Sequence, residues 1–366
     1  MNVPKLRFKE FKDEWITEKV GDSTKILMCK RIFSSDTSDS GEIPFYKIGT
    51  IGSKPDAFIS RELFEQYKNK YNYPRTGEVL ITCSGTVGKC VIFDGKDSYY
   101  QDSNIVWLDN PSKKIINDYL YYYVSNVDWS RLNSTTIVRI YGDNLRNLKI
   151  IYPSNQNEQE KITNTIKLLD KKIELQSKKI EDLKLFKLSI KNNIFKSFDK
   201  EQKMSIEELL EFEQPIKYIV KSEEYTDNRD DIPVLTANKA FILGYCKEGN
   251  FYNKECIIFD DFTLDMKYVN FAFKVKSSAI KILTPKENIN IKYIYEYMQF
   301  LNLHSEEHKR HYISIVQKIQ IPVPIFKIQN KIATQLNCFD SKIELENNKL
   351  LKLTELKKGL MQNMFV

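Results

Sequence analysis

Residues 159–195 read QEKITNTIKLLDKKIELQSKKIEDLKLFKLSIKNNIF, and a related stretch, QNKIATQLNCFDSKIELENNKLLKLTELKKGLMQNMF, occupies residues 329–365. The two stretches align over their whole length without a gap, at an offset of 170 residues. Identical pairs run through both copies: Gln159/Gln329, Asp170/Asp340, Ile173/Ile343, Glu174/Glu344, Leu175/Leu345, Leu183/Leu353, Lys187/Lys357 and Phe195/Phe365. A repeat of this length predicts an internally duplicated architecture.

The composition of both copies predicts long helices. Neither copy contains proline, Gly359 is their only glycine, and Leu, Ile, Lys and Glu dominate. Apolar residues recur in a strict four–three alternation, which is the heptad spacing of a coiled coil. Polar residues interrupt the alternation at the same two places in each copy, Gln176 and Lys187 in the first, Glu346 and Lys357 in the second. A helix over residues 158–195 would be about 57 Å long at 1.5 Å per residue.

We expect the two helices to pack on each other as an antiparallel coiled coil, because a two-fold axis between duplicated modules would make their helices run in opposite directions. A single copy would suit the core helix of a bundle equally well, but two copies with matching polar interruptions favour pairing. The predicted helix–helix seam comprises Leu169, Ile173, Ile180, Leu183, Lys187, Ile190, Ile343, Glu346, Leu350, Leu353, Leu360 and Met364.

The polar seam residues also predict a register. Placing Ile180 directly across from Leu353 sets Lys187 opposite Glu346, and it matches the remaining polar pair in the same way. A shift of one heptad would instead set Lys187 against Phe339, and burying an unpaired amine against a phenyl ring is costly. Two polar gaps without any partner are the alternative to a matched register.

Ahead of each helix lies a module of mixed short strands with one helix near its end, so the fold class is α+β, with two α/β modules separated by the two long antiparallel helices in a pseudo-two-fold duplication. The modules resemble each other weakly in VLIT (79–82) and IIFD (257–260), NIVWL (104–108) and AIKIL (279–283), and DYLYYYVSN (118–126) and KYIYEYMQF (292–300). The predicted domains are residues 1–152, the helix 153–196, residues 197–324 and the helix 325–366.

Composition and missing motifs weigh against most enzyme classes. The chain has 12 glycines, whereas average usage of about 7% would give about 26, so dinucleotide- and phosphate-binding folds are disfavoured. The sequence has no Walker loop, no G-x-S-x-G elbow and no [DNS]-P-P-[YFW] tetrapeptide of the kind that amino-methyltransferases use. A net charge of +7 permits a polyanionic partner without demanding one.

The compartment prediction is cytoplasmic. No run of about 18 apolar residues predicts a membrane span, and the first residues are polar rather than a signal peptide. None of the six cysteines forms a C-x-x-C pair, so we expect reduced, buried thiols. The three histidines, His304, His308 and His311, share one face of a predicted helix, and with Glu307 they match a short zinc-protease pattern. We expect a solvated polar face and no metal, which leaves a metalloprotease as the remotest alternative.

The order of modules and helices resembles the specificity subunits of type I restriction–modification systems. Each helix of that family opens with a P-x(n)-E-Q-x-x-I motif, which appears here as Pro153…Glu158-Gln159…Ile162 and, with Ile328 in place of Glu, before Gln329. The D-x-K-I-E-L segments at 170–175 and 340–345, the opening PKLRFKEFKDEW (4–15) and the turn Gly85-Thr86-Val87-Gly88 also match the family. The resemblance covers essentially the whole chain.

The resemblance implies a non-catalytic, sequence-specific DNA reader. Each module would be a target-recognition domain that reads one half of a bipartite site on double-stranded DNA, while the helices set the spacing and dock two methyltransferase subunits. Two motor-nuclease subunits would join in the full complex. S-adenosylmethionine, ATP and Mg²⁺ would bind the partner subunits, with no cofactor in this chain. A coiled-coil scaffold that binds only protein is the alternative.

The DNA-contacting candidates are basic, hydroxyl and aromatic residues outside the helices. Such residues hold phosphates or read base edges, although most exposed lysines are merely solvated. In the first module they are Lys47, Lys54, Ser84, Thr86, Lys89, Arg139 and Tyr141, and in the second Lys239, Lys274, Lys276, Arg310 and His311. The recognised bases do not follow from sequence, because base contacts depend on loop geometry.

Overall fold

The computed structural model describes residues 3–132, 139–198, 201–221, 224–238, 240–304 and 309–365. The chain divides into two compact units, which we describe separately. Unit 1 comprises residues 1–175 and 350–366, and unit 2 comprises residues 176–349. Each unit therefore holds one module together with the beginning of one long helix and the end of the other.

Unit 1 holds the first module. Its strands are β1 (Trp15–Lys19), β2 (Lys25–Met28), β3 (Ile43–Tyr46), β4 (Phe58–Ile59), β5 (Val79–Thr82), β6 (Cys90–Ile92), β7 (Tyr99–Tyr100), β8 (Ile105–Asp109) and β9 (Lys149–Pro153). Its helices are α1 (Val20–Ser23), η1 (Ser34–Asp36), α2 (Arg61–Lys70), α3 (Asn117–Ser125), η2 (Trp129–Leu132) and α4 (Gly142–Arg146). The strands pair in the orders β2-β8-β5-β6, β4-β3-β7 and β1-β9.

Unit 2 holds the second module. Its strands are β10 (Lys203–Ser205), β11 (Leu210–Glu213), β12 (Ile232–Leu235), β13 (Ile242–Cys246), β14 (Cys256–Asp260), β15 (Met266–Val269), β16 (Lys274–Val275), β17 (Ile280–Pro285) and β18 (Gln320–Pro322). Its helices are α6 (Ile206–Leu209), η3 (Pro215–Tyr218), α7 (Ile291–Phe300) and η5 (Val316–Lys318). The strand orders are β11-β17-β14-β15, β13-β12-β16 and β10-β18.

The two modules share one topology, element by element. Both modules have a four-stranded antiparallel sheet with a β-hairpin at one edge, β5-β6 in the first and β14-β15 in the second. Both also have a three-stranded sheet that combines an antiparallel and a parallel pair. The registers agree as well, because Val79 pairs with Leu108 where Ile257 pairs with Leu283. The four central strands β5, β8, β14 and β17 are almost wholly buried, as expected of runs of apolar β-branched residues. The predicted duplication of an α+β module is confirmed.

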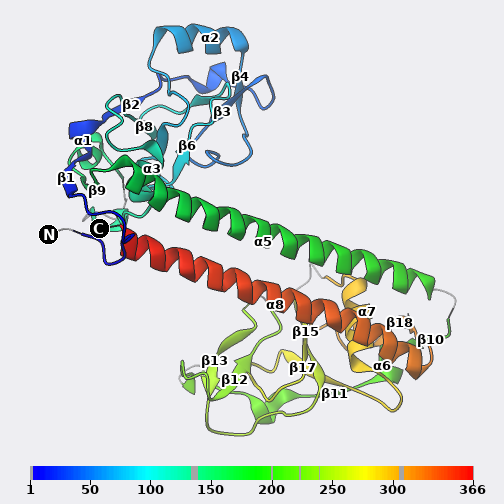
Figure 1. Ribbon diagram of the computed structural model, residues 1–366. Coiled ribbons are helices and arrows are strands. Elements are labelled where there is room, and N and C mark those ends of the chain that lie inside the picture. The colour runs from blue at the N-terminus through cyan, green and yellow to red at the C-terminus, as the bar shows by residue number, and fades with distance from the viewer. Residues whose placement is uncertain are drawn as a thin grey trace. The chain divides into compact units, whose positions relative to one another are not determined.

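Two long helices complete the units: α5 runs from Gln156 to Ser197 and α8 from Phe326 to Met364. Figure 1 shows α5 in green and α8 in orange to red, and within unit 1 the beginning of α5 and the end of α8 run in opposite directions side by side. The core of unit 1 joins the sheet and α3 to both helices through Ile162, Ile166 and Met364. Unit 2 repeats the arrangement with Ile332, Leu336 and Phe195.

The same glutamine anchors each long helix to its module. Gln159 accepts a hydrogen bond from the Ile116 amide at 2.8 Å and donates to the Pro153 carbonyl at 2.9 Å. Gln329 accepts from the Asn290 amide at 2.9 Å and donates to the Pro324 carbonyl at 2.8 Å. Both glutamines are buried, so each satisfies backbone groups that would otherwise be left unpaired near the beginning of a helix.

The predicted seam residues are all buried or partly buried, but the predicted register is wrong. In unit 2, Lys187 does not reach Glu346; its ammonium donates to Asp340 at 2.6 Å and to Glu296 of α7 at 2.8 Å. The Glu346 carboxylate instead accepts a hydrogen bond from the side-chain amide of Gln176 at 2.7 Å. In unit 1, Lys357 pairs with Asp170 at 2.5 Å. These contacts fit the register shifted by one heptad, in which Lys187 lies across from Phe339.

The disfavoured register is possible because lysine is long. The four-carbon side chain of a lysine at the seam extends beyond the helix–helix contact, so its amine reaches a neighbouring carboxylate and is not buried against the phenyl ring. Phe339 packs edge-on against Phe186 instead, with ring centroids 5.6 Å apart. The predicted register takes only the two long helices into account, whereas α7 supplies Glu296 as a further partner for Lys187.

The cysteines are free thiols; four are buried and Cys90 is partly so, but Cys338 is exposed on α8, contrary to the expectation that each would be buried. Among the described residues, no helix is long and apolar enough to cross a membrane.

Candidate nucleic-acid interface

In the first module, several segments converge where β5 ends. The turn between β5 and β6 carries Gly85 and Gly88, both in the left-handed region that glycine tolerates, with φ of 64° and 79°. Ser84 donates to the Asn104 side chain at 2.8 Å. The Lys89 ammonium hydrogen-bonds the Ile51 carbonyl. The turn therefore joins the loop after β3 to the segment before β8.

All five candidates on these two loops are exposed or partly buried, and two of them also hold the turn in place. Thr86 and Lys54 are exposed. Lys47 forms a surface pair with Asp56 at 3.2 Å, a contact of little energetic value that a phosphate could replace. Ser84 is partly buried and Lys89 is tied to backbone, so these two support the turn more than they project from it.

Arg139 and Tyr141 join the same end of the module. The Ile140 amide donates to the Cys83 carbonyl at 2.9 Å, which fixes the segment beside the turn. The Arg139 guanidinium lies 5.7 Å from the centre of the Tyr141 ring, and Tyr141 is 59% exposed. Burial raises the pKa of the Cys83 thiol to about 11, and the adjacent Arg139 charge opposes that rise. These contacts thus join the glycine turn, the loop that carries Lys47 and Lys54, and the segment 139–141 at one end of the sheet.

The second module has a counterpart of this end that the sequence did not reveal. The turn between β14 and β15, residues 261–265, takes the place of the glycine turn although it contains no glycine. The His311 amide donates to the Asp261 carbonyl at 3.0 Å, as Ile140 does to Cys83. Arg310 therefore occupies the position of Arg139, and its guanidinium likewise lies over an aromatic ring, 5.8 Å from the centre of Phe262. An Arg-x-Tyr triplet at 139–141 and 310–312 was the available signal.

Two second-module candidates are wrong. The Lys274 side chain is fully buried, and its ammonium hydrogen-bonds the Glu248 carbonyl, so it cannot reach DNA. His311 is 3% exposed and faces the interior. Both were chosen by residue type alone, and charge says nothing about which way a side chain points. Lys276 is exposed, Arg310 has a side chain 56% exposed, and Lys239 lies outside the described residues.

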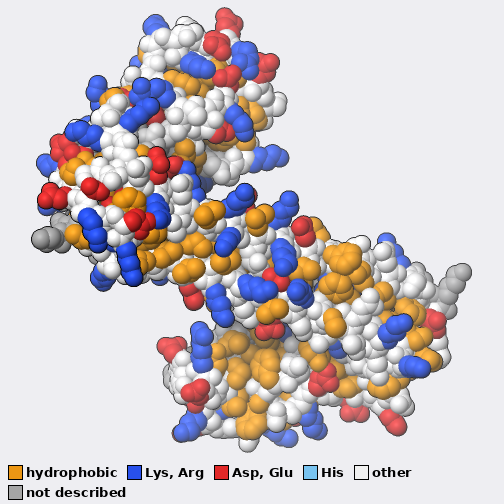
Figure 2. All heavy atoms as spheres, viewed as in Figure 1, with side chains coloured by type: hydrophobic (Ala, Val, Ile, Leu, Met, Phe, Trp, Pro, Cys, Tyr) orange, Lys and Arg blue, Asp and Glu red, His pale blue; other side chains and the backbone are white. Residues whose placement is uncertain are grey.

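Lysine and arginine side chains are interspersed with acidic ones over both units, as Figure 2 shows for one face. This pattern agrees with a net charge of only +7 on 366 residues. Any contact with nucleic acid would therefore depend on a few individually positioned basic residues rather than on a broad basic surface.

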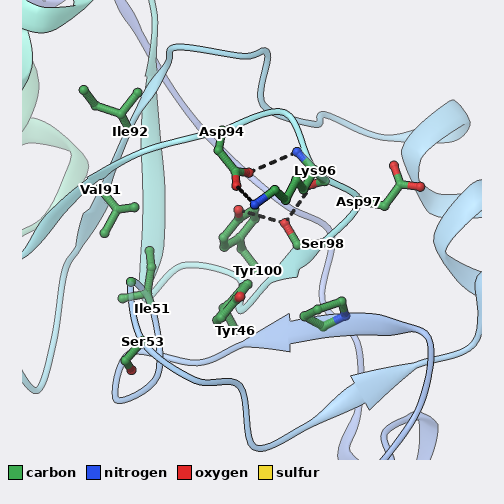
Figure 3. Close-up of a pocket in the computed structure, with 12 residues that line it drawn as sticks. Tyr46, Ile51, Ser53, Val91, Ile92, Asp94, Lys96, Asp97, Ser98 and Tyr100 are labelled. Atoms are coloured by element: carbon green, nitrogen blue, oxygen red, sulfur yellow. Dashed lines mark hydrogen bonds and ion pairs between the residues drawn. The ribbon is translucent and has the colours of Figure 1, made fainter.

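A cavity of about 340 Å³ lies beside the loop that carries Lys47 and Lys54. Figure 3 shows Tyr46 and Tyr100 in its wall, with ring centroids 5.8 Å apart. Its polar groups bond to one another: Lys96 pairs with Asp94 at 3.2 Å, and the Ser98 and Tyr100 hydroxyls are 2.9 Å apart. Across the described part of the chain, no cluster of His, Cys, Asp or Glu could hold a metal ion. Because His308 and Glu307 lie outside the described residues, this finding does not reach the zinc-protease pattern.

Charged clusters where the modules meet the helices differ between the units. In unit 1, Asp170 accepts from the Tyr122 hydroxyl at 2.7 Å and pairs with Lys357. In unit 2, Glu296 occupies the place of Tyr122 and pairs with Lys187, Lys191 and Lys292. Burial opposes ionisation of Asp340, but hydrogen bonds from Lys187 and Lys292 hold its pKa below the ordinary value. Burial lowers the pKa of Lys191, against the attraction of Glu296.

A family model for the type I restriction modification DNA specificity domain matches residues 12–185 and 196–355. The chain belongs to this family. A putative type I restriction enzyme specificity subunit of Haemophilus influenzae is 51% identical over 153 residues, which are 42% of this chain and 39% of that protein. A type I restriction enzyme specificity subunit of Escherichia coli is 44% identical over 125 residues, 32% of this chain and 31% of that protein. The chain thus aligns with less than half the length of these two relatives.

More distant specificity subunits match along the whole chain. A putative subunit of Methanocaldococcus jannaschii is 22% identical, with 98% of this chain and 95% of that protein covered. The crystal structure of a type I restriction–modification S subunit from M. genitalium matches with a TM-score of 0.70 and 17% identity, covering 100% of this chain and 99% of the other. A chain from a structural study of type I complex assembly gives a TM-score of 0.55 at 13% identity, covering 97% of this chain and 98% of the other. At these identities the likeness shows the fold alone.

Proposed function

We propose that this chain is the DNA-recognition subunit of a type I restriction–modification complex. Each module reads one half of a bipartite site on double-stranded DNA, and the long helices set the spacing and dock the partners. The partners are two methyltransferase subunits and, for cleavage, two motor-nuclease subunits, in the cytoplasm. The chain itself catalyses nothing and holds no cofactor; S-adenosylmethionine, ATP and Mg²⁺ bind the partner subunits.

The observation that carries the proposal is the repeated presentation of one arginine. Arg139 and Arg310 occupy equivalent positions, and each is followed by an amide bonded to the carbonyl of the residue directly after the central strand. Two copies of one surface, each ending in an arginine above an aromatic ring, suit two similar but separate reading tasks. Arginine is the residue that most often makes bidentate contacts to guanine in the major groove. Family membership supports the same reading.

The test is selection from random duplex DNA by the chain purified with its methyltransferase subunits. We expect a consensus of two defined blocks separated by unspecified base pairs, with binding that weakens as salt rises. A scaffold that binds only protein would enrich no sequence and would assemble with its partners regardless of DNA. Enrichment of no sequence, or of one continuous block, would contradict the proposal.

The absence of chemistry is tested on the isolated chain. Calorimetric titration with S-adenosylmethionine is expected to give no binding heat, because the proposal places that cofactor on the partner. A saturable binding isotherm would overturn this part of the proposal.

A further inference from the structure

The turn after β14 in the second module contains a buried ion pair. Asp261 is 2% exposed and Lys281, in β17, is 1% exposed, with the ammonium 3.3 Å from the carboxylate. Two charges leave water at such a site only at a cost of several kilocalories, which their attraction and added hydrogen bonds must offset. Apolar residues of similar volume would often stabilise such a site equally well, so the ion pair indicates a role beyond packing.

The Asp261 carboxylate also holds the neighbouring segment. One of its oxygens accepts from the His311 amide at 3.1 Å and from the Tyr312 amide at 2.8 Å. The other oxygen lies 4.0 Å from the Arg310 guanidinium. The carboxylate thus fixes the backbone immediately after Arg310, while the Arg310 side chain remains 56% exposed.

In the first module the equivalent anchor is neutral and comes from another position, because the Tyr141 amide donates to the side-chain oxygen of Asn144 at 2.8 Å. Cys83 stands where the second module has Asp261, since each directly follows its central strand and accepts the equivalent amide on its carbonyl. Val106 stands where the second module has Lys281, as the strand pairings show. The backbone hydrogen bond from Ile140 to Cys83 has its counterpart in the bond from His311 to Asp261.

We infer that Asp261, neutralised by Lys281, is a positioning residue that sets the place of Arg310 and thereby the specificity of the second module for its half-site. This inference rests on the proposed function. Base readout needs an arginine held in one geometry against two acceptors on a base edge, and a backbone clamp beside the arginine supplies that. In the first module the neutral side chain of Asn144 holds the equivalent amide.

The experiment compares two double variants in the chain assembled with its methyltransferase subunits. Asp261→Asn/Lys281→Gln keeps an oxygen acceptor at 261 without charge, whereas Asp261→Ala/Lys281→Gln removes the acceptor. The readout is discrimination, the ratio of affinities for the selected duplex and for duplexes mismatched in one half. Asp265→Asn, an exposed carboxylate in the same turn, is the matched control.

We expect the Asn/Gln variant and the control to discriminate second-half mismatches like the unmodified chain. The Ala/Gln variant should lose about tenfold of that discrimination, within the range for one bidentate contact, and should keep discrimination in the first half. If Ala/Gln loses first-half discrimination too, the chain has misfolded. In that case Asp261→Cys/Lys281→Val carries the same test, because those residues already pack in the first module.

Unchanged second-half discrimination in the variant without an acceptor would overturn the inference, and so would equal loss in both double variants. Either result leaves the proposed function standing. If the unmodified complex discriminates no sequence, the proposed function fails and the inference falls with it.

Discussion

The two modules share strand order, register, helix anchors and the equivalent arginines Arg139 and Arg310, yet several other charged positions differ between them. In the first module Cys83 follows the central strand and leads into the glycine turn, whereas in the second Asp261 follows it and pairs with Lys281. In the first turn of α5, Glu158 pairs with Arg7 at 2.7 Å, and α8 has the apolar Ile328 at the equivalent position. This contrast indicates that the apolar pattern preserves the duplicated fold while several polar residues inside it diverge.

The largest expected effect comes from replacing one module. Exchanging residues 1–150 for the corresponding module of another family member should change the first half of the methylated motif completely and leave the second half as it was. The reason is that each module has its own sheets and core. Methylome sequencing of cells that carry the chimera with its partner subunits reads both halves at once. A change in both halves would refute independent reading.

The next effect concerns the charged clusters where the modules meet the long helices. Glu296→Ala should lower the free energy of unfolding of the α7 region by about 3 kcal/mol, because the three lysines paired with this buried carboxylate lose it together. Tyr122→Phe, at the equivalent place in unit 1, removes one hydrogen bond to Asp170 and should cost about 1 kcal/mol. Hydrogen exchange of the α7 and α3 amides measures the two separately. Equal losses would mean that the clusters are not as different as their contacts indicate.

A pH-dependent effect is expected at Glu346. Hydrogen bonds from Gln176 and then Lys179 hold the pKa of this carboxyl at about 2, below its ordinary 4.5. A carboxyl with a lowered pKa stabilises the folded state above its ordinary pKa and loses that contribution as the pH falls toward the folded value. Glu346→Gln should therefore lower the melting temperature at pH 7 and make a smaller difference near pH 3. The exposed Glu355→Gln is the control, and a difference that grows on acidification would contradict the contacts described.

The smallest effect belongs to the exposed first-module lysines. Lys54→Ala should weaken binding to all sequences alike and reduce the slope of log affinity against log salt by about one unit, as for one lost phosphate contact. Lys274→Met, at the buried second-module lysine, should leave that slope unchanged. Titrations at several salt concentrations settle both. A change in sequence preference for Lys54→Ala would mean that this lysine reads bases.

Much of the fold could be predicted from repetition. The equivalences of VLIT with IIFD and of NIVWL with AIKIL are confirmed residue for residue by the strand registers. The register of the long helices could not be predicted, because it depends on where a lysine amine ends up and on Glu296 from a third helix. The site could be predicted only in part for a similar reason. Residue type pointed to Arg139 and Arg310, whose contact with DNA stays a prediction, and only packing shows that Lys274 and His311 are buried. Asp261 was missed because its role comes from backbone amides 50 residues away.

The central claim is that equivalent arginines read separate half-sites, and the most direct test is the methylome of two variants side by side. Arg139→Ala should relax base preference within the first half of the motif only, and Arg310→Ala within the second half only. Each should leave the spacing between the halves unchanged, since neither residue lies on a long helix. If either substitution altered both halves, or if neither altered any base, the account of two independent readers would be contradicted.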